Sequence, residues 1–251
     1  MGADKQQNWA IGDIFGLDEE LLAFMPQPCL AVLLLIPCTT KTPDTGKAEH
    51  GQKLFYMKQP DELGNACGTI ALFHAFANHM EELGSLAPSH ALSLSLSFSL
   101  ISSITDPHCV TMVAYGLLAC CNSTCSLVTD AWEGMKEGPL ATWIDGVKDM
   151  TPEQRGDALN SQEDLNDLHN SSAVQGATEV KVEGVEHHFI CFTSIEGHLY
   201  ELDGRKSGPV CHGEIKDASM LHAAARVIKE AYIAPNPDLC EFAMMSVAPA
   251  Q

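Results

Sequence analysis

The residue types that can do chemistry gather at a few places in this 251-residue sequence, and Cys67 is the first of them. It lies in "GNACGTIALFHAFANHM", between small residues and an apolar pattern with helical spacing. Asn65 is a favourable N-cap, so we expect a helix whose second residue is Cys67. Unpaired backbone N–H groups and the helix dipole favour a thiolate there. Cys67 is therefore a candidate nucleophile, with a packed structural cysteine as the alternative.

A histidine and an aspartate fall on one predicted hairpin. The stretch "HHFICFTSIEGHLYELDGR", residues 187–205, predicts two strands joined by a tight turn. In a hairpin centred between Ile195 and Glu196, His188 lies directly opposite Asp203. Opposed side chains share one face of the sheet, with Cβ atoms roughly 4.5–5.5 Å apart. The carboxylate of Asp203 can therefore hold the imidazole ring of His188.

Together these residues give the parts of a thiol hydrolase. Cys67 supplies a nucleophile, His188 a base and Asp203 an orienting acid, in the chain order of papain-like enzymes. The neighbouring His187 and His198 are interpreted as ordinary core or surface residues. The sequence contains no GxSxG, HExxH or phosphate-binding glycine loop, so serine-based and metal-based hydrolysis have no comparable support. We expect no metal and no cofactor.

Several segments must position these candidates. The run Leu30 to Ile36 is short, apolar and closed by Pro37, which predicts a strand buried on both faces. The polar stretch Lys41 to Lys53 predicts a loop. The sequence Thr151 to Glu153, with proline in second place, is typical of a helix start.

Charge and composition limit the class of protein. The chain has 14 Lys and Arg against 33 Asp and Glu, a formal net charge of -19, which disfavours nucleic acid and anionic membranes and favours a basic partner. The N-terminal "MGADKQQNW" has no apolar signal-peptide core, so we expect a cytosolic, or also nuclear, monomer with reduced thiols. We expect one catalytic domain over residues 9–251, after a short extension of residues 1–8.

Residues 86–132 differ in amino-acid composition from the rest of the chain, because they contain only two formal charges but four of the ten cysteines. Four interpretations stay open: a membrane span at Val110 to Val128, a metal site, an ordered insertion, or sequence that does not belong to the fold, such as non-coding sequence translated by read-through. We favour the last and expect no catalytic role. The metal site would use His108, Cys120, Cys121 and Cys125.

Longer motifs around the candidates resemble a known family. "YMKQ" followed by "GNACGTIALFHA", and "HFICF" followed by "GHLYELDGRKSGPV", resemble the small single-domain ubiquitin carboxyl-terminal hydrolases, which are cysteine deubiquitinases. The likeness runs from about Trp9 to the C-terminus, excluding residues 86–132. It implies an α/β (α+β) fold of the knotted papain-like type, with a central antiparallel sheet flanked by helices.

The resemblance also implies roles for individual residues. Cys67 takes the position of the nucleophile, His188 that of the general base and acid, and Asp203 that of the orienting residue. Gln59 takes the position of the side-chain donor of the oxyanion hole. A crossover loop at about Leu168 to Gly184 would lie over the cleft. The implied activity is hydrolysis of small adducts or peptides from the C-terminal glycine of ubiquitin, with ubiquitin or a ubiquitin-like modifier as partner.

The chain departs from the family pattern in three ways. "PDEL" places extra residues between Gln59 and Gly64, and residues 86–132 interrupt the domain. The sequence also starts almost at Trp9, whereas the family usually has a helix before this segment. A displacement of about 1 Å in a catalytic group can cost on the order of a hundredfold in rate. The alternative hypothesis is therefore a catalytically impaired ubiquitin-binding protein of the same fold.

Overall fold

The computed structural model describes residues 9–41, 47–48, 54–61, 66–83, 139–161, 187–216, 219–238 and 242–250. The strands are β1 Trp9–Asp13, β2 Ala31–Pro37, β3 Lys47–Ala48, β4 His187–Ile195, β5 His198–Leu202, β6 Val210–Glu214 and β7 Ala243–Pro249. They form one sheet in the order β1-β7-β2-β4-β5-β6-β3, and every neighbouring pair is antiparallel. The expected central antiparallel sheet is confirmed.

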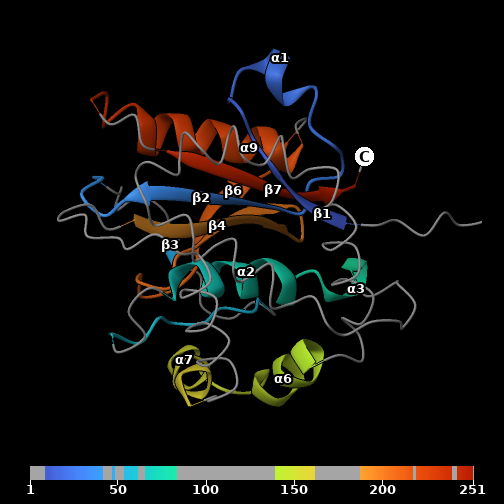
Figure 1. Cartoon of the computed structure of the whole chain (residues 1–251), viewed down its shortest axis with the longest axis vertical. Helices are drawn as coiled ribbons and strands as arrows, with labels where there is room; N and C mark the ends of the chain where they lie inside the picture. Colours follow the sequence, from blue (N-terminus) through green and yellow to red (C-terminus); the bar gives the residue numbers. More distant parts are fainter. Residues whose placement is uncertain are drawn as a thin grey trace, which may run out of the picture.

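Helices cover both faces of this sheet, as Figure 1 shows. They are α1 Glu19–Leu22, α2 Cys67–Ala77, α3 Met80–Leu83, α6 Pro139–Val147, α7 Pro152–Asn160 and α9 Met220–Val227, which continues into the π-helical turn η3 Ile228–Ile233. α9 packs on one face and α2 on the other, while α6 and α7 lie beyond α2 (Figure 1). The expected α/β class is therefore confirmed.

The strand β2 joins two hydrophobic cores. All seven of its residues are buried. Leu33 and Leu35 belong to the core on the α2 side, whereas Val32, Leu34 and Ile36 belong to the core on the α9 side. Alternate side chains of a strand point to opposite faces, so a continuous apolar run fills both cores. The predicted strand with two buried faces is confirmed.

Two further sequence predictions meet different outcomes. The helix start at Thr151 is confirmed, because the hydroxyl accepts from the backbone N–H of Gln154 and the Gln154 side chain accepts in return, forming a capping box. The loop predicted over Lys41 to Lys53 is partly wrong, because β3 lies within it and pairs with β6. Two residues of strand are too short to leave a hydrophobic period in the sequence.

Other predictions fall on residues outside those described. The atypical block 86–132, with its proposed span and metal set, lies there, and so does the crossover loop at Leu168 to Gly184. Across the described ranges, no helix is long and apolar enough to cross a membrane. The same ranges contain no group of three or more His, Cys, Asp or Glu side chains placed to hold a metal ion. The extent of the domain stays a prediction.

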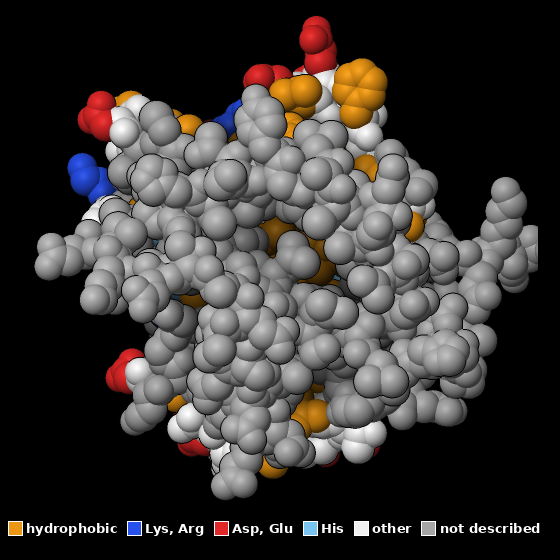
Figure 2. All heavy atoms as spheres, viewed as in Figure 1, with side chains coloured by type: hydrophobic (Ala, Val, Ile, Leu, Met, Phe, Trp, Pro, Cys, Tyr) orange, Lys and Arg blue, Asp and Glu red, His pale blue; other side chains and the backbone are white. Residues whose placement is uncertain are grey.

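The surface around α1 combines acidic and apolar side chains. Phe15 and Phe24 are exposed, and Glu19 and Glu20 occupy the first turn of α1. Figure 2 shows acidic and hydrophobic side chains side by side at the end of the molecule where α1 lies in Figure 1.

Candidate active site

Cys67 is the first residue of α2, the helix that packs against β4. The residue before the helix is Ala66, so the prediction that Cys67 would be the second helical residue is wrong by one position. Asn65, the predicted cap, lies outside the described residues. The chemical consequence is unchanged, because the first turn of a helix still presents unpaired N–H groups to the thiol. The Cys67 side chain is buried.

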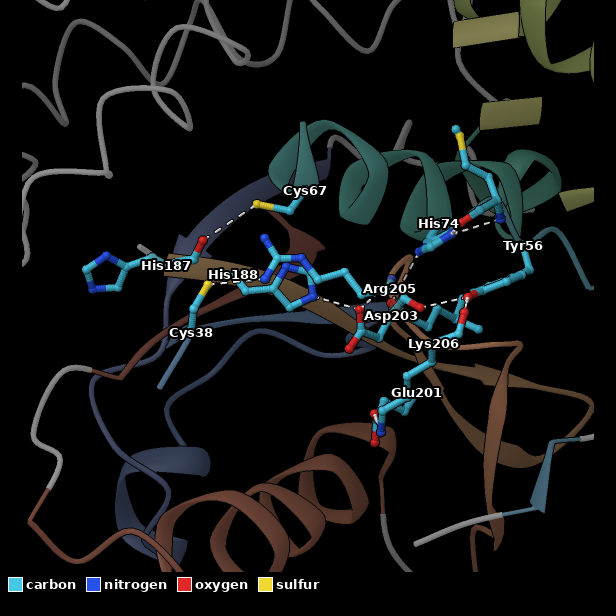
Figure 3. A network of polar contacts seen from close by, with 12 residues as sticks. Cys38, Tyr56, Cys67, His74, His187, His188, Glu201, Asp203, Arg205 and Lys206 are labelled. Carbon is cyan, nitrogen blue, oxygen red and sulfur yellow. Dashed lines mark hydrogen bonds and ion pairs between the residues drawn. The ribbon is translucent and has the colours of Figure 1, made fainter. Parts of the chain in front are cut away.

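His188 and Asp203 form a direct hydrogen bond. The Nε2 atom of His188 lies 2.6 Å from Oδ1 of Asp203, and both side chains are buried. The backbone N–H of Arg205 donates to the same Oδ1 over 2.9 Å. The carboxylate is therefore fixed by its own turn while it fixes the imidazole (Figure 3).

The register that brings this pair together differs from the predicted one. The hairpin turns at Glu196 and Gly197, which both have positive φ, of 50° and 76°. Ile195 therefore pairs with His198, and the prediction that His188 lies directly opposite Asp203 is wrong by two positions. Two consecutive residues with positive φ define a type I′ turn, which twists with the strands and closes the hairpin with a two-residue loop. A shift of two keeps every side chain on its face, so the pair meets diagonally.

The Cys67 thiol sits beside this pair. Its Sγ lies 3.9 Å from the carbonyl oxygen of His187, and Figure 3 shows Cys67 at the start of α2 facing that strand. Burial, the largest influence, would raise the pKa of Cys67, but the interactions with His188 and the charge of Arg205 outweigh it, and the pKa of the thiol is lowered. A lowered pKa increases the thiolate fraction, and the thiolate is the nucleophilic form.

The partners of the thiol shift in the complementary direction. Burial would lower the pKa of His188, but Asp203 and Cys67 hold it above its ordinary value. Burial would raise the pKa of Asp203, but His188, the Arg205 backbone N–H and Lys206 hold it below its ordinary value. Among the described residues, Nδ1 of His188 accepts no hydrogen bond, so it is the ring atom available for the thiol proton. These directions favour a thiolate–imidazolium pair.

Gln59 lies against the turn that follows Asp203. Its backbone N–H donates to the carbonyl oxygen of Gly204 over 2.9 Å. A Cβ atom on Gly204 would lie 3.2 Å from both N and Cβ of Gln59, so glycine lets the two segments approach closely. The backbone of Gln59 is thereby tied to the residue adjacent to Asp203.

Three residues of this region had no role in the sequence-based prediction. Arg205 influences the thiol and donates from Nη1 to the sulfur of Cys38 over 3.2 Å. His74 is fully buried two turns along the helix of Cys67. The sequence signal for His74 was its place on the buried face of a helix, where a histidine needs a partner for each nitrogen that is cut off from water. Cys38 and Arg205 gave no local signal.

The arrangement of a helix-terminal thiol, a buried imidazole and an orienting carboxylate is that of a thiol hydrolase. The chain also matches the family model "Ubiquitin carboxyl-terminal hydrolase, family 1" over residues 1–100 and 109–233. The protein therefore belongs to the ubiquitin carboxyl-terminal hydrolase family, a family of cysteine peptidases. The predicted resemblance is confirmed.

Individual relatives agree with this membership. Ubiquitin carboxyl-terminal hydrolase 3 of Arabidopsis thaliana is 30% identical over 245 residues, which cover 94% of this chain and 82% of the relative. The ubiquitin carboxyl-terminal hydrolase of Drosophila melanogaster is 29% identical over 255 residues, covering 97% of this chain and 88% of that protein. Ubiquitin carboxyl-terminal hydrolase isozyme L1 of Homo sapiens is 30% identical over 231 residues, which cover 88% of this chain and 80% of that protein.

A solved structure shares the fold at lower identity. The UCH37 catalytic domain of Trichinella spiralis, crystallised with ubiquitin vinyl methyl ester, superposes with a TM-score of 0.57 at 16% identity. The match covers 97% of this chain and 86% of that domain. At this identity the likeness concerns the fold, which agrees with the expected papain-like architecture.

Proposed function

We propose that this protein hydrolyses the bond after the C-terminal glycine of ubiquitin, and that Cys67, His188, Asp203 and Gln59 are its catalytic residues. The observation that carries the proposal is the buried hydrogen bond from His188 to Asp203 beside a thiol at a helix start. Burial, together with the lowered pKa of Cys67 and the raised pKa of His188, gives this site the charge distribution that thiol catalysis requires.

The proposed reaction is acyl transfer in two steps. The Cys67 thiolate attacks the glycine carbonyl carbon, and the oxyanion receives hydrogen bonds from the Gln59 side chain and the Cys67 backbone N–H. The His188 imidazolium donates its proton to the leaving amine or alkoxide as the bond to the carbonyl breaks. Water then attacks the thioester, His188 takes its proton, and the Cys67 thiolate leaves as the ubiquitin carboxylate forms.

The substrate class follows from charge and from the relatives. The formal net charge of -19 favours encounter with a basic peptide tail, because a negative surface attracts it over several ångströms. The Trichinella domain carries a ubiquitin ester in its crystal, which supports ubiquitin as the partner here. We propose small adducts and unfolded peptides as leaving groups, as expected for a cleft beneath a crossover loop.

Covalent labelling tests this proposal. Ubiquitin vinyl methyl ester is mixed with the full chain, and intact mass spectrometry detects a one-to-one adduct at Cys67. The variant Cys67→Ala should bind ubiquitin without forming the adduct, whereas Cys211→Ala should label like the wild type. Cys211 is a suitable control because it is a half-buried thiol of β6, which pairs with β3 and β5 and not with β4, the strand of His188.

Turnover of a fluorogenic C-terminal amide of ubiquitin completes the test. The wild type should release the fluorophore, and His188→Ala should lower kcat by about 10² or more. Ubiquitin binding without adduct or turnover by the wild type would refute the enzyme proposal and support the catalytically impaired binding protein. Labelling at a cysteine other than Cys67 would refute the assignment of the nucleophile.

A further inference from the structure

The segment 54–60, which carries Gln59, belongs to no strand of the sheet. Its backbone is held instead by the side chains of His74, on α2, and of Asn78, the residue that caps the C-terminus of α2. Asn78 Oδ1 accepts from Phe55 N–H over 2.8 Å, and Asn78 Nδ2 donates to Phe55 O over 2.9 Å. The Nε2 atom of His74 accepts from Met57 N–H over 3.0 Å. The side chains of His74 and Asn78 thus form the backbone hydrogen bonds that a neighbouring strand would otherwise form.

The geometry of the two elements explains why this works. Asn78, the C-cap residue of α2, has a helical backbone conformation and follows His74 by four residues, so the two side chains lie on the same face of the helix. Four residues of α-helix advance about 6 Å, and two residues of extended chain advance about 6.6 Å. The two side chains therefore match the alternate residues Phe55 and Met57. The next residue in this alternation is Gln59, whose N–H bonds to Gly204.

The second nitrogen of His74 reaches the strand that leads to Asp203. Its Nδ1 lies 3.2 Å from the carbonyl oxygen of Leu202, while Nε2 lies 3.0 Å from N and 3.1 Å from O of Met57. We assign the ring proton to Nδ1, so that Nδ1 donates to Leu202 and Nε2 accepts from the Met57 N–H. The ring stacks on Tyr56 with centroids 5.2 Å apart. The Tyr56 hydroxyl lies 2.7 Å from the carbonyl oxygen of Asp203. Figure 3 shows His74 and Tyr56 together on the side of the network away from Cys67.

His74 therefore links the segments that carry three of the four proposed catalytic residues, Cys67, Gln59 and Asp203. It sits on the helix of Cys67, it binds the segment of Gln59, and it binds β5 next to Asp203. Its side chain is fully buried, so none of these bonds competes with water. Without the His74 acceptor, the Met57 N–H would be buried with no hydrogen-bond partner and no access to water. The segment would then have to move to satisfy it.

We propose that His74, with Asn78, is a positioning residue that sets the place of the Gln59 side chain relative to the Cys67 thiol. This inference rests on the proposed function, since it concerns the oxyanion donor of that reaction. Neither residue touches substrate; both act through the backbone of residues 55–57. The segment can then hold Gln59 in place even though extra residues separate it from Gly64.

A matched pair of substitutions separates the two bonds of His74. His74→Gln keeps a polar atom near the position of Nε2 and so retains the bond to Met57. His74→Asn keeps a donor near the position of Nδ1 and so retains the bond to Leu202, but loses Met57. Turnover of a ubiquitin C-terminal ester reports the oxyanion hole. Alkylation of Cys67 by iodoacetamide reports the thiolate and needs no oxyanion donor.

The expected result is a loss of about tenfold or more in kcat for His74→Asn with KM unchanged, and a smaller loss for His74→Gln. The alkylation rate of Cys67 should stay within about twofold of wild type in both variants. In a Gln59→Ala background, His74→Asn should change kcat by less than about twofold, because the two residues act on one interaction. Asn78→Ser, at a half-buried position, should show the same pattern if a His74 variant does not fold.

Three outcomes would overturn the inference. Equal losses of kcat in His74→Asn and His74→Gln would show that the bond to Met57 does not control turnover. Alkylation that falls in step with kcat would show a general collapse of the site. Additive losses of His74→Asn and Gln59→Ala would show that the residues act independently. Wild-type turnover in the same assay tests the proposed function separately, because an inactive wild type would refute that function and not only the role of His74.

Discussion

The Nε2 atom of His188 lies 2.6 Å from Oδ1 of Asp203, although the hairpin register does not place these residues opposite each other. Asp203 follows the end of β5, and its carboxylate reaches diagonally back to β4. A register change of two positions preserves the face of each side chain, whereas a change of one would turn His188 away from the carboxylate. The pair therefore depends on the register that the turn at Glu196 and Gly197 sets, because only registers that differ by an even number of residues keep both side chains on one face.

Replacing Asp203 should lower the rate of catalysis without weakening the binding of ubiquitin. Asp203→Asn keeps an oxygen for the Arg205 N–H but removes the charge that holds the pKa of His188 above its ordinary value. We expect kcat to fall on the order of 10²-fold or more, with ubiquitin affinity unchanged. Steady-state kinetics and a binding isotherm measure the two quantities. Asp145→Asn, on the exposed face of α6, is the matched control and should behave like wild type.

The activity should show a bell-shaped dependence on pH. The pKa of Cys67 is lowered and that of His188 is raised, and both shifts favour the thiolate–imidazolium pair, which we expect to be the active form at intermediate pH. Activity falls on the acid side because the thiolate is protonated, and on the alkaline side because the imidazolium loses the proton needed by the leaving group. Arg205→Gln should move the acid limb of kcat/KM to higher pH, because a positive charge that lowers the pKa of Cys67 is removed. An unmoved acid limb would contradict the role of Arg205.

Acid should weaken the fold through His74. Burial lowers the pKa of His74 to about 4 from its ordinary 6.5, opposed in part by the backbone carbonyl oxygens of Met57 and Leu202, which lie against the two ring nitrogens. The unfolded chain therefore binds a proton that the folded chain refuses, and the free energy of unfolding falls as pH drops between these values. The contribution amounts to about 3 kcal/mol.

Urea unfolding at a series of pH values measures this contribution. The difference in unfolding free energy between wild type and His74→Gln should change steadily as the pH falls from about 6.5 to about 4, because the variant cannot titrate there. Other acid-sensitive groups, such as Asp203, are common to both proteins and cancel in the difference. Parallel curves for the two proteins would show that His74 is not held neutral by the fold.

The sequence predicted the parts of the site better than their exact placement. Local patterns were sufficient for β2, for the capped start of α7 and for a hairpin carrying His188 and Asp203, because each depends on neighbouring residues. The register failed because the choice between turn types depends on whether Glu196 accepts a positive φ, which composition alone leaves open.

Long-range contacts could not be predicted in the same way. The bonds from His74 to Met57 and Leu202 join residues 17 and 128 positions apart, so they exist only once α2 packs on the sheet. The bond of Asn78 to Phe55 is of the same kind: it spans 23 positions and lies where α2 ends, before α3 begins at Met80. Periodicity reports burial, but it does not report which backbone atom a buried polar side chain will meet.

Arg155 should stabilise the same segment from the opposite side. Its guanidinium donates to the carbonyl oxygens of Tyr56, Val147 and Lys148 and lies 4.6 Å from the centre of the Phe55 ring. Arg155→Met removes these bonds and should lower the free energy of unfolding by about 2 kcal/mol. Lys148→Met breaks only an exposed ion pair with Asp145, so its unfolding free energy should be close to that of the wild type. Thermal or urea unfolding compares the two, and equal effects would contradict the assignment.

Two glycines in neighbouring helices provide the sharpest steric test of how Gln59 is supported. A Cβ atom on Gly156 of α7 would come within 2.2 Å of the carbonyl oxygen of Lys58, the residue before Gln59, whereas one on Gly146 of α6 would meet nothing within 4 Å. Gly156→Ala must push the backbone of Lys58 aside, since a peptide carbonyl cannot rotate away like a flexible side chain. We expect a loss of about 1–3 kcal/mol in unfolding free energy together with a lower kcat.

Gly146→Ala should instead raise stability by up to about 1 kcal/mol and leave kcat unchanged, because alanine restricts the unfolded chain and favours the helix. Unfolding curves and ester turnover for both variants measure the contrast. If Gly156→Ala lost stability but kept full kcat, the position of Lys58 would not control that of Gln59. Since the Lys58 N–H also bonds to the Pro152 carbonyl, the displacement should instead pass along the backbone to Gln59, and both quantities should fall together.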